Sequence, residues 1–153
     1  MPRHSEKRVV PYTDEQMFAL VADVERYPEF LPWCAGVRIR SREESTFTAD
    51  LIAAFGALRE RFTSRVMLDH PARTITIEYI EGPFEHLTNR WVFVTTENGC
   101  EIAFDIDFRF RSRTLEALIS GMFTRAIEKM TGAFVTRADK LYGGSANLPA
   151  QEI

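Results

Sequence analysis

Three polar side chains interrupt strand patterns that are otherwise apolar, and they are the residues best placed to do chemistry inside a fold. Glu60, Ser64 and Asn89 each occupy a position where the two-residue alternation of a β-strand favours an apolar side chain. A buried polar group costs free energy unless it is hydrogen-bonded. Ser64 and Asn89 therefore predict hydrogen bonds, either within a filled core or to a ligand in a cavity. Glu60 follows the Gly56-Ala57 turn and is also expected at the solvent-exposed rim of the sheet.

The residues that usually catalyse reactions or bind metals are scattered along the chain. His4, His70 and His86 are isolated from one another, and there is no G-x-S-x-G nucleophile elbow and no glycine-rich phosphate loop. Asp105 and Asp107 lie two apart on the outward face of a strand, where surface pairs with arginines are more usual than an acid–base couple. The sequence therefore predicts no catalytic residue, no catalytic cofactor and no metal site.

Composition and charge limit the class of protein. The 153 residues are 45% hydrophobic and 27% charged, which is typical of a globular domain. A formal charge of −3 argues against a dedicated nucleic-acid-binding protein, and no DNA partner is expected, although local basic patches stay possible. No run approaches the ~20 apolar residues that span a membrane, and no signal-peptide core follows the charged start. We therefore expect a soluble, cytoplasmic protein that touches a membrane only from outside.

Two cysteines report on the redox compartment. Cys34 and Cys100 have neither the spacing of a metal site nor that of a redox motif. We expect two free thiols in a reducing compartment rather than a disulfide.

The elements that position these residues are organised around segment 112–142. Its apolar residues recur every three or four positions, so they lie on one side of an α-helix, and most of its charges lie on the other. At ~1.5 Å per residue a single helix of this length is about 45 Å long. Its apolar side therefore needs a large apolar partner. The residues on that side are Leu115, Leu118, Ile119, Met122, Phe123, Ile127, Met130, Phe134, Val135 and Leu141.

The preceding segment supplies that partner. Residues 9–12 predict a short strand, and 13–16 form a capping box that starts a helix. Pro28 opens a second short helix and Pro32 ends it. After Pro32 the period changes from 3.6 to 2 over about six strands joined by turns such as Asn98-Gly99. The predicted fold is α+β, with a curved antiparallel sheet of about six to seven strands wrapped around the long C-terminal helix.

The sheet face predicted to meet this helix is rich in aromatic side chains. Such stripes usually fill a core, but they also wall cavities for apolar ligands. Gly121 and Gly132 each cost the helix about 1 kcal/mol relative to alanine, and predict either close packing with a mild kink or space for a ligand or lid. The apolar turn 53–58 is expected either beneath the helix or at the cavity mouth, with basic residues beside it that favour anionic lipid. Those residues are Arg59, Arg61 and Arg65.

Three groups of residues resemble a known family. They are stretch 23–34 (DVERYPEFLPWC), stretch 81–87 (EGPFEHL) with Trp91 and Phe93 after it, and, near the C-terminus, Phe123, Lys129-Met130, Ala133-Phe134, Arg137-Ala138 and Leu141-Tyr142-Gly143. In this order, over nearly the whole chain, they resemble the coenzyme Q-binding branch of the START-like (polyketide cyclase/dehydrase, SRPBCC) superfamily. The resemblance implies a helix-grip fold around a hydrophobic tunnel. It places one domain at 1–143 and a flexible tail at 144–153.

The resemblance also implies a ligand. That ligand is ubiquinone or a related prenylated lipid, carried as a chaperone or transporter that supports respiratory electron transport, with transient contacts to a membrane surface. Gly121 is expected to face the tunnel. The predicted ligand-binding residues are Trp33, Phe55, Phe62, Ser64, Tyr79, Leu87, Asn89, Trp91, Phe104, Phe108, Leu118, Met122, Phe123 and Met130.

Two alternatives remain open from the sequence. Bacterial members of this family are described as ribosome-association toxins that act on the large ribosomal subunit. An aromatase- or cyclase-like enzyme is the other alternative, and it requires a polar cluster in the tunnel. For the first, the candidate contacts to ribosomal RNA phosphates are Arg38, Arg40, Arg42, Arg125, Lys129, Arg137 and Lys140.

Overall fold

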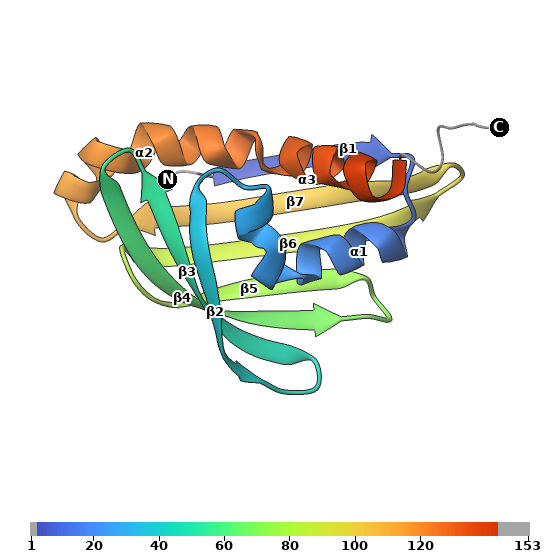
Figure 1. Cartoon of the computed structure of the whole chain (residues 1–153), viewed down its shortest axis with the longest axis horizontal. Coiled ribbons are helices and arrows are strands. Elements are labelled where there is room, and N and C mark those ends of the chain that lie inside the picture. Colours follow the sequence, from blue (N-terminus) through green and yellow to red (C-terminus); the bar gives the residue numbers. More distant parts are fainter. Residues whose placement is uncertain (1–2, 144–153) are drawn as a thin grey trace.

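Seven strands form one antiparallel sheet with an apolar inner face, and helices cover that face (Figure 1). The computed structural model describes residues 3–143, so the tail predicted at 144–153 lies outside the described residues. The spatial order is β1-β7-β6-β5-β4-β3-β2. The α+β class, the strand number and the two short helices after the first strand agree with the prediction. The strands are β1 (Arg3–Val10), β2 (Cys34–Arg42), β3 (Thr46–Phe55), β4 (Leu58–Asp69), β5 (Thr74–Glu81), β6 (Phe84–Thr96) and β7 (Gly99–Phe110).

The first strand begins earlier than the sequence predicts. A strand was expected at 9–12, whereas β1 runs from Arg3 to Val10. This segment is highly charged and has no apolar alternation, because β1 is an edge strand that pairs only with β7. Its extended form comes from backbone hydrogen bonds to β7, and the pattern of side chains in the sequence does not indicate such bonds.

The two short helices follow β1. Thr13 and Gln16 form the predicted capping box, with the Thr13 hydroxyl accepting from the Gln16 amide and the Gln16 side chain accepting from the Thr13 amide, both at 3.0 Å. This box starts α1 (Asp14–Ala22). The second helix is the 3₁₀ helix η1 (Val24–Glu29), and Pro28 lies inside it rather than at its first position.

The turn between β6 and β7 is shifted by one residue from its prediction. Thr96 pairs with Gly99, so the two-residue loop is Glu97-Asn98 rather than Asn98-Gly99. Gly99 serves a different purpose. A Cβ atom there would lie 1.9 Å from the carbonyl oxygen of Val10, so only glycine allows the end of β1 to approach β7 this closely.

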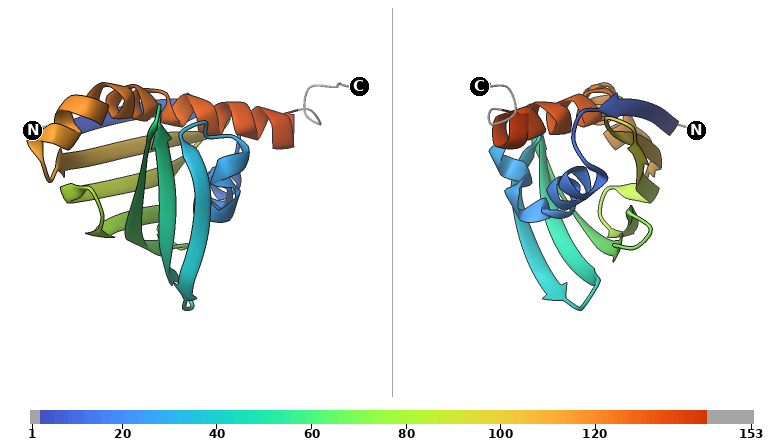
Figure 2. Two further views of the ribbon diagram at one scale, coloured as in Figure 1. Left: turned by 60° about the vertical axis from the view of Figure 1, so that its left-hand side comes forward. Right: turned by 90° about the vertical axis from the view of Figure 1, so that its right-hand side faces the viewer.

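The C-terminal helix is broken, where the sequence predicted one continuous helix. Ser112 caps α2 (Arg113–Glu128), and α3 (Met130–Ala138) follows, ending in a π-turn over Asp139–Gly143. Lys129, between the helices, has φ −97° and ψ 0°. Two weak helix formers, Thr131 and Gly132, lie in the first turn of α3, within three residues of Lys129, and they weaken helical continuity at this point. Both helices still run along the same side of the curved sheet (Figure 2).

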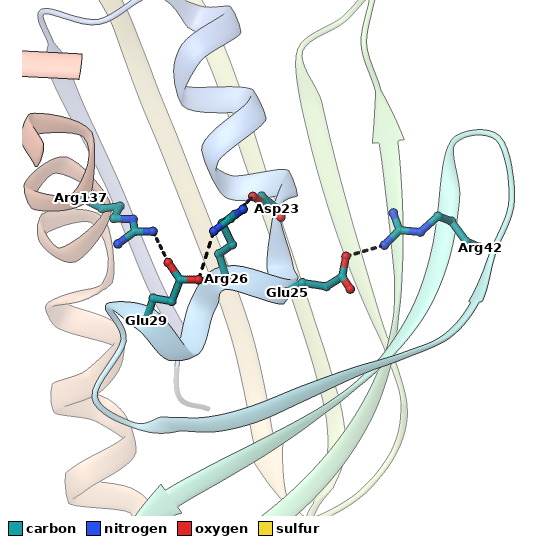
Figure 3. A network of polar contacts seen from close by, with 6 residues as sticks. All are labelled: Asp23, Glu25, Arg26, Glu29, Arg42 and Arg137. Atoms are coloured by element: carbon teal, nitrogen blue, oxygen red, sulfur yellow. Dashed lines mark hydrogen bonds and ion pairs between the residues drawn. The ribbon is translucent and has the colours of Figure 1, made fainter. Parts of the chain in front are cut away.

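An ion-pair network fastens η1 to its neighbours (Figure 3). The Glu29 carboxylate accepts hydrogen bonds from Arg137 of α3 at 2.5 Å and from Arg26 at 3.2 Å. The hydrogen bond from Arg137 holds the pKa of Glu29 below its usual value. On the other side of η1, Arg42 of β2 donates to Glu25 at 3.0 Å. The segment between α1 and β2 is therefore tied both to the helical layer and to the sheet edge.

The position of Arg42 departs from strict alternation. In the sequence, Arg38, Arg40 and Arg42 alternate with Val37 and Ile39, which predicts one basic strand face, but the pairing of β2 with β3 shifts between Ile39 and Ser41. Such a bulge reverses the side to which later residues point. Arg42 pairs in register with the buried Phe47 and lies over its ring at 5.1 Å, on the inner side of the sheet.

Phe134 of α3 lies at the centre of the packing between helices and sheet. It is fully buried, and its ring packs against Tyr27 and Phe30 at 5.3 and 5.1 Å and against Trp91 of β6 at 5.1 Å. One side chain thus connects η1, α3 and the sheet.

We predict that Phe134→Ala lowers the free energy of unfolding by about 3–5 kcal/mol, because it removes a buried ring and leaves a cavity. Thr136→Ala, an exposed position on the same helix, is the matched control and is expected to change stability by no more than about 0.5 kcal/mol. Urea denaturation followed by circular dichroism measures both. Equal effects of the two substitutions would contradict the central position of Phe134.

Candidate functional site

An apolar cavity of about 80 Å³ lies between the sheet and the broken helix. Residues of β3, β4, β5, β6 and β7 form its floor, and η1, α2 and α3 form its roof. Its walls are mostly aliphatic and aromatic, as in sites for apolar ligands. The lining residues are Val24, Tyr27, Trp33, Leu51, Phe55, Phe62, Ser64, Val66, Ile77, Leu87, Asn89, Trp91, Ile106, Phe123, Ala126, Ile127, Met130 and Phe134.

Two polar atoms in these walls are buried without a hydrogen-bond partner among the described residues. They are the hydroxyl oxygen of Ser64, on β4, and the indole nitrogen Nε1 of Trp33, just before β2. Leaving such a group unpaired costs roughly 1–3 kcal/mol. An indole N–H only donates, and a hydroxyl donates or accepts. The pair therefore suits a ligand that is apolar overall and carries a hydrogen-bond acceptor.

The other polar groups of the cavity are already engaged. Asn89 donates from its side-chain amide to the backbone oxygen of Asp105 at 2.9 Å, and its oxygen accepts from Trp91 Nε1 at 3.1 Å. Tyr27 donates to the backbone oxygen of Val21 at 2.5 Å, and burial raises the pKa of its hydroxyl, which stays neutral. The main role of Asn89 is therefore to orient the Trp91 ring. Its second amide hydrogen is not used in these bonds.

A second, more open hollow of about 320 Å³ adjoins the cavity. It lies between the segment that enters β2, the β3–β4 turn and the helix break. The cavity and the hollow share four wall residues, Trp33, Phe55, Ala126 and Met130. A rotation of the Trp33 and Met130 side chains is therefore the shortest way to join the two spaces.

The structure brings nine of the fourteen predicted ligand-binding residues to the cavity wall. They come from the segment before β2, from β3, β4 and β6, and from both sides of the helix break. Whether they contact a ligand stays a prediction. They are Trp33, Phe55, Phe62, Ser64, Leu87, Asn89, Trp91, Phe123 and Met130.

Two predicted residues are buried but pack on other rings instead of facing the cavity. Phe104 lies 4.6 Å from the ring of Trp91, and Phe108 lies 4.7 Å from the ring of Phe123. Alternation correctly placed both on the inner face. The neighbouring rings fill the space in front of them, so these positions are core and not cavity wall.

Three further predicted residues lie away from the cavity. The Tyr79 hydroxyl accepts a hydrogen bond from the backbone of Phe84 at 3.0 Å and so helps to shape the β5–β6 turn. Leu118 is 54% exposed on the outer side of α2, and Gly121, also predicted to face the tunnel, is exposed as well. Met122 lines the outer hollow instead. The outward positions follow from the helix phase, since Ile119 and Phe123 point inward.

Nine cavity residues were not predicted as ligand contacts. Leu51, Val66, Ile77 and Ile106 lie on the inward strand faces, so alternation carried the signal for them. Val24 and Tyr27 belong to η1, whose position over the cavity is set by tertiary packing alone. The remaining three, Ala126, Ile127 and Phe134, come from the broken helix.

Both cysteines are free thiols and buried. Burial raises the pKa of each thiol to about 11, which makes both poor nucleophiles at neutral pH. Within residues 3–143 there is no group of three or more His, Cys, Asp or Glu side chains that could hold a metal ion. In the same residues no helix is long and apolar enough to cross a membrane.

We predict that Ser64→Ala raises the free energy of unfolding by about 1 kcal/mol, because it removes a buried hydroxyl that has no partner. Thr63→Ala is the matched control from the adjacent position. The Thr63 hydroxyl donates to Asp50 at 2.6 Å, so its loss is expected to destabilise the protein by about 1–3 kcal/mol. Urea titrations give both values. Destabilisation by Ser64→Ala as large as that by Thr63→Ala would contradict the unpartnered state of Ser64.

Comparisons with known proteins agree with the fold. The chain is 39% identical over 136 residues to the ribosome association toxin RatA of Pseudomonas aeruginosa, which covers 88% of this chain and 94% of that protein. It is 30% identical over 145 residues to the mitochondrial coenzyme Q-binding protein COQ10 homolog B of Xenopus laevis, covering 92% of this chain and 59% of that protein.

A solved structure shares the fold at low sequence identity. The Zhui aromatase/cyclase from a Streptomyces species has a TM-score of 0.78 at 19% identity, over 91% of this chain and 94% of that one. At this identity the likeness supports the START-like fold alone. Residues 10–135 match the family model described as polyketide cyclase / dehydrase and lipid transport. Since that match takes in most of the chain, this protein belongs to the polyketide cyclase / dehydrase and lipid transport family.

Proposed function

We propose that this protein associates with the ribosome, on its large subunit, in the cytoplasm. The observation that supports the proposal is the likeness to the RatA toxins, which spans nearly the whole length of both proteins. The coenzyme Q-binding relative is more distant, and this chain covers little more than half of it.

The lining of the cavity favours a binding role over catalysis. Its polar members are Tyr27, Trp33, Ser64 and Asn89, and no charged side chain is among the lining residues. Acid–base catalysis depends on a titratable group near the reacting atoms, and the titratable side chain in this lining, Tyr27, already donates its hydroxyl proton to the backbone oxygen of Val21 and has its pKa raised by burial. The aromatase- or cyclase-like alternative therefore has no further support from the cavity.

We expect the purified protein to pellet with isolated large ribosomal subunits through a sucrose cushion at about 50 mM salt and to be released at about 300 mM, because phosphate contacts weaken steeply with salt. Isolated small subunits are the matched control and should leave the protein in the supernatant. Failure to pellet with large subunits at low salt would overturn the proposal.

A second candidate function is the binding of a prenylated quinone, and the unpartnered groups of Ser64 and Trp33 favour it. Both can donate to a quinone carbonyl oxygen, and the apolar walls suit an isoprenoid chain. The cavity of about 80 Å³ is smaller than the roughly 300–1,000 Å³ of typical ligand sites. Binding therefore requires the Trp33 and Met130 side chains to open the cavity into the outer hollow.

We predict that organic extraction of the purified protein yields a prenylated quinone, and that Ala126→Phe reduces the yield at least tenfold by blocking the shared wall. Ala117→Phe places the same ring on the exposed side of α2 and is the control that should retain the ligand. Mass spectrometry identifies the extracted molecule. Absence of quinone from the unmodified protein, or full retention by Ala126→Phe, would contradict this candidate.

A further inference from the structure

The outer face of β2, β3 and β4 carries a group of arginines. Arg38 of β2 lies opposite Asp50 of β3, and Ile52, two residues further along β3, lies opposite Arg61 of β4. Paired residues point to the same side of a sheet, and this side is opposite to the one that faces the cavity. We name this surface the arginine face. Its arginines are Arg38, Arg40, Arg59, Arg61 and Arg65.

The acidic residue within the arginine face on β3 is already neutralised. The Asp50 side chain is only 4% exposed, and its two oxygens accept from Arg40 at 3.0 Å and from the Thr63 hydroxyl at 2.6 Å. A buried carboxylate with these two partners is a fixed structural element. Because Arg40 is paired with Asp50, it is not free to bind a phosphate, and the pair ties β2 to β3 beneath the arginine face.

The other four arginines of the face are exposed and have no ion-pair partner among the described residues. Arg38 and Arg61 flank a hollow of about 340 Å³, with Gly36, Val37, Asp50 and Ile52 as its other walls. Arginine stays charged at every physiological pH, and its planar fork matches phosphate oxygens. Glu78 of β5 lies opposite Arg65 and lowers the positive charge at that edge, so the concentrated positive surface is the part around Arg38, Arg59 and Arg61, on a protein of net charge −3.

The chemistry of this face fits RNA better than a membrane. The large exposed hydrophobic residues of the described chain are Val9, Ile80, Val94, Leu118 and Leu141, and none belongs to β2, β3 or β4. Basic residues attract anionic lipid headgroups, but surface binding to lipid is strengthened by apolar side chains that enter the bilayer, and this face offers none of them exposed. The nearby β3–β4 turn does not supply them, because its two large apolar side chains pack inward: Phe55 is buried with its ring 5.9 Å from that of Phe123, and Leu58 is partly buried against the core.

The arginine face is also better suited to bind phosphates than the outer side of the C-terminal helices, where the sequence analysis predicts further basic contacts. Arg137 is only 12% exposed and is bound to Glu29. Exposed acids, among them Glu116 and Glu128, lie between the remaining basic residues of α2. That side mixes both signs of charge, so it offers no continuous attraction to a phosphate backbone.

We propose that the arginine face binds the phosphate backbone of RNA, with Arg38 and Arg61 gripping phosphates at the hollow between them. This inference rests on the proposed ribosome association and names the surface that makes the contact. Arg38 and Arg61 extend from neighbouring positions of the sheet on either side of the hollow, and the buried Asp50–Arg40 pair lies between the strands that carry them.

The test compares Arg38→Gln/Arg61→Gln with Arg90→Gln/Arg113→Gln, which removes two exposed arginines from β6 and α2. Binding to a fluorescent oligouridine and to large ribosomal subunits is measured over a salt series. The first variant should bind both at least about tenfold more weakly at ~0.1 M salt, and the slope of log affinity against log salt should fall by about 2. The control should stay within about twofold of the unmodified protein. Unchanged melting temperatures confirm that both variants fold.

Each outcome separates this inference from the proposed function. If the unmodified protein binds subunits and the first variant binds as well, or the control loses as much, the arginine face is not the contact and ribosome association stands. If the protein binds oligouridine through Arg38 and Arg61 but does not pellet with subunits, the inference holds and the proposed function fails. Arginine-dependent binding to vesicles of anionic phospholipid without binding to RNA would overturn the inference.

Discussion

Burial of one apolar sheet face is the constraint on which the rest of this structure depends. Every strand from β3 to β7 turns aliphatic or aromatic side chains to the same side, and that side must be kept from water. A slip of one residue in any pairing would expose the whole inner set of a strand, so the register is strongly specified. The helices are arranged to cover this face. Phe134 of α3 lies at the point where α3, η1 and the sheet meet.

The cavity lies where this covering is incomplete. Lys129 interrupts the C-terminal helix, and Met130, the next residue, lines the cavity together with Trp33. The space between the helix break and the sheet is not filled by side chains. Two buried polar atoms, on Ser64 and Trp33, remain unpaired there. A chain shaped only for stability would replace or pair such groups. Their presence in an otherwise apolar wall is the feature of the cavity that supports the proposed ligand site.

Neighbouring residues of one strand serve the two faces in different ways. Ser64 points inward to the cavity, whereas Thr63 points outward and holds Asp50 beneath the arginine face. The sheet thus carries an apolar site on one side and a positive surface on the other, separated by the thickness of one backbone layer. The proposed ligand site and the proposed RNA contact therefore share β3 and β4 as a common rigid support.

Much of the candidate site was predictable, because the alternation of apolar and polar residues indicates which face of a strand is buried. It correctly placed Phe62, Ser64 and Trp91 on the inner face, and they line the cavity. It also placed Phe104 and Phe108 there, yet these rings fill the core. Alternation records burial and does not record whether the space opposite a side chain is occupied. That depends on which distant elements meet there, as Val24 and Tyr27 of η1 do.

By itself, the sequence determined the α+β class, the capping box at Thr13, most strands and the apolar side of the C-terminal segment, since these depend on local periodicity. Only the tertiary structure decided the extent of β1 and the inward turn of Arg42. An edge strand is made by hydrogen bonds to its neighbour, and a bulge is made by the pairing of two strands. Both are relations between segments, and no single segment carries them in its own pattern.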